Sequence, residues 1–164
     1  MSESGPELLV RNSTAADLDA VYALIAAHNE EHAVCARKEI PAMLAVRGRH
    51  CGLYVGERED RIVGCVGFYQ DHDVDDVYWA VWLYVLPGQR CAGIGKRLWS
   101  HMEKAVKNLR ARKLYLDVGN EETHEDAIRF HRKNGFVREG KLLDYFAAGS
   151  HKLIFGKPLA TGTD

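Results

Sequence analysis

Apolar residues recur along this 164-residue chain with two different periods, and each period predicts a type of secondary structure. Apolar positions three or four residues apart predict helices over residues 13–32 and 94–109. Two β-branched and aromatic runs, residues 50–57 and 61–70, are joined by a short polar segment and predict an antiparallel hairpin. The aromatic run over residues 77–87 ends at a proline and predicts a further strand.

Short polar signals predict where some of these elements begin. Ser13 or Thr14 is expected to cap the first helix. Thr123, followed by Asp126, resembles an acidic capping box ahead of a helix over residues 126–133. The Asn-Gly pair that follows this last helix is expected to end it.

The remaining elements complete an interleaved order. A second short helix is expected from Ile40 to Val46, with Pro41 in its first turn. Further strands are expected over residues 8–12, 113–119, 136–146 and 151–156. The order β-α-α-β-β-β-α-β-α-β-β predicts an α/β (α+β) fold, with a mixed central sheet of about seven strands flanked by about four helices. We expect a single domain over residues 1–164, with an ordered core over about residues 8–159.

Composition narrows the class of protein. Hydrophobic residues make up 46% and charged residues 27%, which is typical of a globular chain. The formal net charge of −1 argues against nucleic acid as the main partner. The polar N-terminus and the absence of a long apolar run predict neither a signal peptide nor a membrane span. Four scattered cysteines without a regular spacing indicate reduced thiols, so we expect a cytoplasmic protein.

The segment QRCAGIGKRLW, residues 89–99, places two glycines where a helix must begin. The first turn of a helix has N–H groups without intrahelical partners and carries partial positive charge. Glycine lets those groups approach a diphosphate closely, and Lys96 and Arg97 add positive charge. The segment is therefore a candidate anion site, although glycine spacing alone is equally consistent with a simple turn.

Two common nucleotide-binding motifs do not fit this segment. A Walker loop requires Ser or Thr after its lysine, but Lys96 is followed by Arg97. A dinucleotide fingerprint requires a third glycine, but Leu98 occupies that position.

The order Arg90-x-x-Gly93-x-Gly95 resembles the R/Q-x-x-G-x-G/A motif of the GNAT superfamily of acyl-CoA-dependent N-acetyltransferases. VYWAVWLYVLPGQRCAGIGKRL is similar to the fourth strand and pyrophosphate loop of that family. AIRFHRKNGF is similar to its A-x-x-F-Y-x-K-x-G-F segment, and LLDYFAAGSHKLIFGKPL to the closing strands of one branch. Together these segments cover residues 77–159, and the preceding element order also fits.

The resemblance implies that acetyl-CoA is the co-substrate and that residues of this segment bind it. The loop residues would offer mainly N–H groups to the pyrophosphate; they are Arg90, Cys91, Ala92, Gly93, Ile94, Gly95 and Lys96. The strand residues Leu83, Tyr84 and Val85 would hold the pantetheine arm, chiefly through main-chain groups, as an added strand would. Asn120 and Lys133 are weaker candidates, for the pantetheine and the 3′-phosphate respectively.

Acetyl transfer to an amine requires a base, since deprotonating a lysine-like ammonium at pH 7 costs about 4 to 5 kcal/mol. Trp79 stands where some family members carry a glutamate base, and indole cannot accept this proton. The nearest titratable candidates are Asp75, Asp76 and Tyr78. Of these, Asp76 in the acidic segment DHDVDD is a candidate proton relay, although that segment also fits a solvated turn. The base itself stays unassigned.

The departing thiolate needs a proton donor. His131 stands where the family commonly has a tyrosine with that role, and a packing role for this histidine is the alternative. Tyr145 is a substitute donor or substrate contact. His72, His124 and Asp126 do not form pairs at metal-ligand spacing, and the reaction requires no metal.

These observations predict an N-acetyltransferase that acts on a primary amine of a small molecule or a protein. Two alternatives stay open: an acyl-CoA-binding sensor without catalysis, since two catalytic positions are non-standard, and a regulatory domain that binds ATP at the loop. The closing strands could also support a homodimer.

Overall fold

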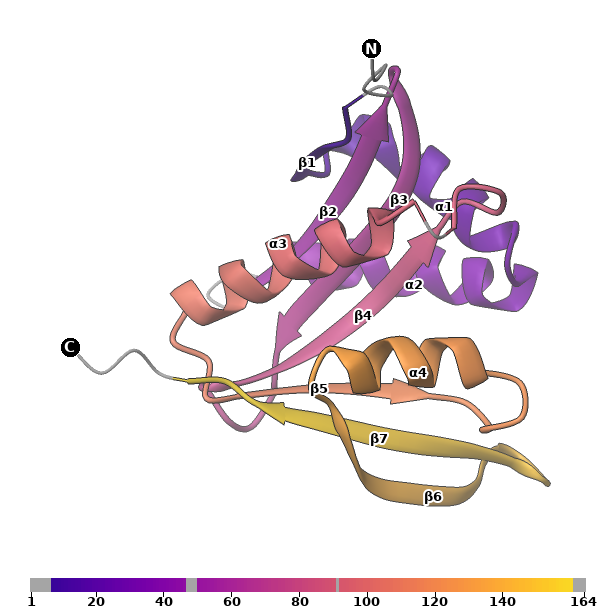
Figure 1. The fold of residues 1–164 in the computed structure, drawn as a ribbon, viewed down its shortest axis with the longest axis vertical. Helices are drawn as coiled ribbons and strands as arrows, with labels where there is room; N and C mark the ends of the chain where they lie inside the picture. The colour runs from indigo at the N-terminus through magenta and orange to yellow at the C-terminus, as the bar shows by residue number, and fades with distance from the viewer. Residues whose placement is uncertain (1–6, 47–49, 91, 161–164) are drawn as a thin grey trace, which may run out of the picture. The chain divides into compact units, whose positions relative to one another are not determined.

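The computed structural model describes residues 7–46, 50–90 and 92–160. Hydrogen bonds link seven strands in the order β1-β2-β3-β4-β5-β7-β6, and four α-helices accompany them, which confirms the predicted fold class (Figure 1). The elements are β1 (Leu9–Asn12), η1 (Ala15–Asp17), α1 (Leu18–Ala26), α2 (Glu30–Ala45), β2 (Cys51–Arg58), β3 (Arg61–Gln70), β4 (Val77–Val85), α3 (Ile94–Asn108), β5 (Lys113–Val118), α4 (Glu125–Lys133), β6 (Val137–Ala147) and β7 (Ser150–Pro158).

The chain divides into two compact units. The first contains Met1–Tyr69 and Ala80–Leu109, and the second contains Gln70–Trp79 and Arg110–Asp164. Strand β4 therefore contributes its first three residues to the second unit and the remainder to the first. The single domain expected over residues 1–164 stays a prediction.

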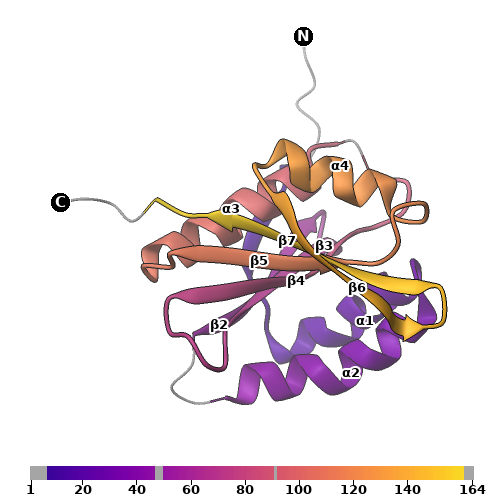
Figure 2. The ribbon, with the colours of Figure 1, turned by 90° about the horizontal axis from the view of Figure 1, so that it is seen from below.

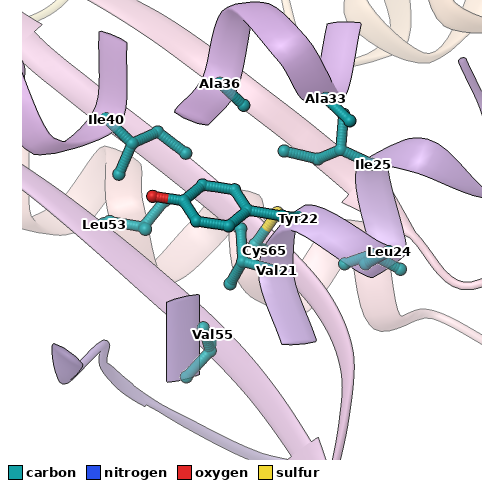
Figure 3. Close-up of a cluster of buried hydrophobic side chains, with 10 residues drawn as sticks. All are labelled: Val21, Tyr22, Leu24, Ile25, Ala33, Ala36, Ile40, Leu53, Val55 and Cys65. Carbon is teal, nitrogen blue, oxygen red and sulfur yellow. The ribbon is translucent and has the colours of Figure 1, made fainter. Parts of the chain in front are cut away.

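The β2–β3 hairpin is the centre of the first unit, and its two faces pack against different helices. Figures 1 and 2 show α1 and α2 on one face and α3 on the other. Leu53, Val55 and Cys65 belong to a buried cluster with apolar residues of α1 and α2 (Figure 3). On the opposite face, a Cβ at Gly64 would lie 2.7 Å from the Leu98 side chain of α3. Both faces are apolar because side chains alternate along a strand and each face has helices to cover it.

The helical region before β2 differs from the prediction. The predicted helix over residues 13–32 ends at Ala26, and α2 starts at Glu30, so the short helix expected from Ile40 is wrong. Asn29 explains this start, since its side chain accepts a hydrogen bond from the His32 N–H at 3.1 Å and caps α2. Pro41 therefore lies inside a long helix rather than in its first turn.

The other two cap predictions have different outcomes. Thr14 precedes η1, and its N–H donates to the Asp17 carboxylate at 2.7 Å, which confirms this helix start. The capping box expected at Thr123 is wrong, because His124 precedes α4 and the Thr123 hydroxyl donates to the Asn120 carbonyl. A turn over residues 120–124 uses the hydroxyl that the cap would have needed.

The second unit contains β5, the β6–β7 hairpin and α4. Strand β7 pairs antiparallel with both β5 and β6, and β5 pairs in parallel with residues 77–79 of β4. Helix α4 runs beside β5 (Figure 1). Strand β6 is the edge strand and exposes Leu142, Leu143, Tyr145 and Phe146.

Candidate functional site

The loop between β4 and α3 begins with a tight turn. The Gln89 N–H donates to the Leu86 carbonyl at 3.0 Å, with Pro87 and Gly88 between them. Gly88 has φ +84° and follows Pro87. A positive φ at the third position is typical of a type II turn, in which glycine is favoured there. The Gln89 side chain also accepts a hydrogen bond from Arg58 of β2 at 3.2 Å. The chain is therefore fixed in direction just before the glycine motif.

Gly93 starts helix α3 in a conformation that other residues rarely adopt. Its φ is +73°, and a Cβ at this position would meet no atom within 4 Å. The first intrahelical hydrogen bond runs from the Arg97 N–H to the Gly93 carbonyl at 3.0 Å, and Gly93 itself offers no side-chain cap. The N–H groups of Ile94, Gly95 and Lys96 therefore lie before the first i to i−4 hydrogen bond of α3 and have no carbonyl partner within the helix. Glycine is needed here for its backbone conformation, and its open surroundings let a ligand reach these groups.

Other predicted loop residues lie near this start. Ala92 and Lys96 are exposed, Ile94 is buried, and Cys91 lies outside the described residues. Lys96 also lines a groove of about 790 Å³ between α3 and β1, together with Glu7 and Arg97. Lys96 and Arg97 therefore place two positive charges at the first turn of α3.

The end of β4 is irregular just before the residues predicted to bind pantetheine. Trp82 has φ +56°, an uncommon value for a bulky residue, and the Cys65 thiol donates to its carbonyl at 3.2 Å. Leu83, Tyr84 and Val85 follow and are partly buried. Burial raises the pKa of the Tyr84 phenol well above its usual range, so this group stays protonated.

Two histidines that sequence reasoning did not select lie beside this strand end. The imidazole Nε2 of His28 is 2.6 Å from the Val85 carbonyl, and its Nδ1 is 2.8 Å from Nη2 of Arg90. His32 Nδ1 is 2.7 Å from the Tyr84 hydroxyl. The sequence signal is their location in the polar segment AHNEEH, whose Glu30 and Glu31 are consistent either with a contact to a cationic substrate or with an exposed helix end. The structure thus brings Tyr84, Val85 and Arg90 together around two histidines.

The predicted catalytic and remaining binding residues belong to the second unit. His131 on α4 is 8% exposed, with its ring edge-on to Phe130 and Phe136. Burial lowers the pKa of His131 to about 4, so the imidazole is neutral at pH 7. Because a neutral imidazole gives up its N–H proton far less readily than an imidazolium, this environment favours the packing alternative.

Asp76 lies just before β4 and forms an ion pair with Arg112. The guanidinium Nε and Nη2 donate to its carboxylate at 2.9 and 3.2 Å, and the Arg112 N–H donates to its carbonyl at 2.8 Å. The hydrogen bond from Arg112 lowers the pKa of Asp76. A lowered pKa weakens a carboxylate as a proton acceptor, so this ion pair does not favour the relay expected from the sequence.

Tyr145 and Lys133 are exposed. The Tyr145 ring lies 5.0 Å from the Phe146 ring, and the Lys152 ammonium lies 4.6 Å from its centroid. Lys133 occupies the last turn of α4, where a cation interacts favourably with the helix dipole. The roles expected for the two residues stay predictions.

Asn120 joins the end of β5 to the β6–β7 turn. Its amide nitrogen donates to the Gly149 carbonyl at 2.9 Å, and its amide oxygen accepts from the His151 N–H at 2.7 Å. These two contacts with described residues use one hydrogen and one lone pair of the amide, which has two of each. The predicted contact with pantetheine would therefore be additional to a structural role.

The described residues give two findings on metals and membranes. Over the described residues, no three or more His, Cys, Asp or Glu side chains come together as metal ligands would. Among the helices in the described ranges, none has the length and apolar character that a bilayer crossing requires.

Comparison with known proteins adds the family. Residues 17–136 match the family model described as the acetyltransferase (GNAT) family. The chain is similar to the solved structure of a Desulfovibrio desulfuricans protein assigned to this family, with 19% identity and a TM-score of 0.85, over 94% of this chain and 100% of that one. No curated protein sequence matches the chain.

Two further solved structures are similar in fold. An aminoglycoside 6′-N-acetyltransferase complexed with coenzyme A is 16% identical, with a TM-score of 0.77, over 95% of this chain and 99% of that one. A ribosomal-protein-S18-alanine N-acetyltransferase from Escherichia coli is 15% identical, with a TM-score of 0.76, over 96% and 97% of the two chains. At these identities the likeness concerns the fold.

Proposed function

Since the chain belongs to the acetyltransferase (GNAT) family, we propose that it transfers the acetyl group of acetyl-CoA to a primary amine by direct attack in a ternary complex. The amine belongs to a small molecule or to a protein. One observation carries the proposal: Gly93, with φ +73° and open space at its Cβ, presents the N–H groups that open α3. A diphosphate is the anion that such an array of N–H groups accommodates.

The loop and the strand end would divide the binding of acetyl-CoA between them. The first-turn N–H groups of α3, with the Lys96 ammonium beside them, would hold the pyrophosphate. The main-chain groups of Leu83 and Val85 would hold the amides of the pantetheine arm, since an amide chain can pair with an exposed strand end. The similar aminoglycoside acetyltransferase was solved with coenzyme A, which supports this choice of co-substrate.

The reaction requires three further contributions. The amine nitrogen must lose its proton before it attacks the thioester carbonyl. The oxygen that gains charge in the tetrahedral intermediate needs a donor, and a main-chain N–H on β4 is suited to that role. The sulfur leaves as a thiolate, and His131 or Tyr145 is the predicted donor of its proton. The lowered pKa of His131 makes Tyr145 the stronger candidate of the two.

Calorimetric titration with acetyl-CoA tests the proposal first. We expect micromolar binding by the wild-type protein and its loss in Gly93→Glu, because a carboxylate would repel the pyrophosphate and the side chain would strain the loop. Gly149→Glu is the matched control, since Gly149 also has a positive φ, +77°, and open space at its Cβ. Retained binding in Gly93→Glu, or equal loss in both variants, would place acetyl-CoA elsewhere.

Turnover separates an enzyme from a binding module. The wild-type protein should release free coenzyme A thiol in the presence of a suitable amine, which a thiol reagent measures. Binding of acetyl-CoA without thiol release from any amine in a broad panel would favour the sensor alternative. Binding of ATP to the glycine loop, without displacement by coenzyme A, would instead favour the nucleotide-binding alternative.

The proposal includes a homodimer as an expectation for the assembly. The edge strand β6 exposes Leu142, Leu143 and Phe146, and an exposed apolar edge strand is suited to pairing with a second copy. Sedimentation velocity measures the mass in solution. A monomer at all concentrations would contradict this expectation without affecting the proposed reaction.

A further inference from the structure

His28 occupies the short connection between α1 and α2, where its backbone N–H donates to the Ile25 carbonyl at 3.0 Å. Its ring reaches two groups that are 57 and 62 residues away in the sequence. Nε2 lies 2.6 Å from the Val85 carbonyl, and Nδ1 lies 2.8 Å from Nη2 of Arg90. The imidazole therefore bridges the last residue of β4 and the first residue of the glycine motif.

The two contacts together determine the protonation state of the ring. A carbonyl oxygen can only accept a hydrogen bond, so the proton must be on Nε2 of His28. A guanidinium can only donate, so Nδ1 of His28 must hold a free lone pair. His28 in this arrangement is therefore the neutral Nε2–H tautomer. The imidazolium form would place a second N–H opposite the Arg90 guanidinium and break that hydrogen bond.

The arrangement also fixes the position of Arg90. The Arg90 side chain is exposed, and the long side chain of an arginine has many rotamers in water. The His28 ring is in turn packed 5.3 Å from the Tyr84 ring, centroid to centroid. Gln89, the preceding residue, is held in the same way by Arg58 at 3.2 Å. Two consecutive side chains at the start of the loop are thus bound by residues from other parts of the first unit.

We propose that His28 is a positioning residue, which acts through Arg90 to hold the glycine loop in the conformation that receives the coenzyme A pyrophosphate. This inference rests on the proposed function. An Arg90 side chain that is already held in place loses less conformational entropy when acetyl-CoA binds. The affinity of the protein for acetyl-CoA is therefore higher. His28 also engages the Val85 carbonyl, which leaves that oxygen one lone pair for the pantetheine arm.

A double-mutant cycle on acetyl-CoA affinity tests the coupling. His28→Phe keeps an aromatic ring against Tyr84 but removes both hydrogen bonds, and Arg90→Met removes the guanidinium. We expect His28→Phe to raise the Kd for acetyl-CoA about fivefold in the wild-type background, because the bond that positions Arg90 is the one of the two that affects binding. In the Arg90→Met background the same substitution should have much less effect. An equal rise in both backgrounds, or no rise in either, would overturn the inference.

His101→Phe is the matched control. His101 is a histidine of α3 whose described contact is with the Tyr54 ring, at 4.6 Å between centroids. We expect this substitution to leave the Kd for acetyl-CoA unchanged in both backgrounds. A fivefold rise in this control would mean that loss of any histidine in the first unit weakens binding, which would overturn a specific role of His28.

Nitrogen NMR tests the hydrogen bonds without acetyl-CoA. At about pH 8, His28 should show a protonated Nε2 and an unprotonated Nδ1, as its two contacts require. Arg90→Met should shift the Nδ1 resonance and leave Nε2 protonated. A protonated Nδ1 in the wild-type protein would overturn the inference. If the tautomer is as expected but the wild-type protein binds no acetyl-CoA, the proposed function fails and the positioning role fails with it, whereas the hydrogen bonds are confirmed.

Discussion

The indole N–H of Trp79 donates a hydrogen bond of 2.8 Å to the carboxylate of Asp71, within the second unit. Asp71 also accepts the N–H of Asp73 at 2.9 Å, and these two bonds, the one from Asp73 first, lower its pKa. Trp79 stands where some family members carry a base. Here it is instead a hydrogen-bond donor that favours the charged form of the Asp71 carboxylate. The acidic segment DHDVDD is an ordered turn as a result.

We expect Trp79→Phe to raise the pKa of Asp71 towards that of a free aspartate. The substitution keeps an aromatic ring beside Tyr115, whose ring is 5.2 Å away, but removes the donor. Carbon NMR of the Asp71 carboxyl group during a pH titration measures the change. An unchanged pKa in Trp79→Phe would show that the Asp73 N–H alone stabilises the carboxylate.

A second prediction concerns the ion pair between Arg11 of β1 and Asp17 of η1. Arg11 donates to the Asp17 carboxylate at 2.7 and 2.9 Å, and the Thr14 N–H donates to the same group at 2.7 Å. These bonds, chiefly the one from Arg11, hold the pKa of Asp17 well below its usual range. We expect Asp17→Asn to lower the free energy of unfolding at pH 7 by about 2 kcal/mol, because Asp17 is 7% exposed and the Arg11 guanidinium loses one of its two carboxylate partners, the other being Glu57 at 2.8 Å.

The pH dependence of this effect has a definite sign. Because the folded pKa is depressed, the stabilisation is present above the unfolded aspartate pKa of about 3.9 and is lost as pH falls below it. Urea unfolding of the wild-type protein and Asp17→Asn at pH 7 and below pH 4 should therefore show a difference that shrinks in acid. Asp19→Asn, on the exposed side of α1, is the control and should have little effect. A difference that is independent of pH would contradict the prediction.

A third prediction uses the buried imidazole of His131. Its pKa of about 4 lies below the unfolded value of about 6.5, so the neutral form is favoured by folding. The stabilisation is complete above pH 6.5 and is lost as pH falls towards 4, by about 3 kcal/mol in total. We expect His131→Gln to reduce the pH dependence of urea unfolding between pH 7 and 4.

Kinetics of the same variant test the general-acid hypothesis. If His131 protonates the leaving thiolate, kcat in His131→Gln should fall and its pH profile should change. Wild-type turnover from pH 6 to 9 in this variant would remove the hypothesis and leave Tyr145 as the candidate, for which Tyr145→Phe is the corresponding test.

A fourth prediction concerns the contact between β3 and the start of α3. A Cβ at Gly64 would lie 2.7 Å from Leu98, 3.1 Å from the Tyr84 carbonyl and 3.2 Å from Ile94. We expect Gly64→Ala to destabilise the protein by about 1 to 3 kcal/mol and to weaken acetyl-CoA binding, because it displaces the first turn of α3. Thermal unfolding and calorimetry measure the two effects.

Gly140→Ala is the control for this substitution, since the atoms nearest to its added Cβ lie 3.9 Å away, on Ile154. Equal destabilisation by both variants would show that the loss of glycine, rather than crowding at α3, is responsible.

The predicted strands of the β2–β3 hairpin and the glycine start of α3 were accessible from the sequence because their causes are local. The nearly continuous apolar run along residues 61–70 reflects a strand with both faces covered, and Gly93 marks a left-handed backbone conformation that glycine adopts readily. The start of α2 was missed although Asn29 is a common cap, because the helical spacing continues across the break. The matched family extends over residues 17–136, so the resemblance noted at the loop was also accessible.

The sequence by itself therefore determined the element types, the loop that opens α3 and the family, since each follows from neighbours in the chain. Only the tertiary structure decided which side chains accompany that loop. His28 meets Val85 and Arg90 from 57 and 62 residues away, and His131 has a lowered pKa because folding removes it from water. Contacts over such separations, and the desolvation they cause, depend on the packing of whole elements rather than on any local pattern.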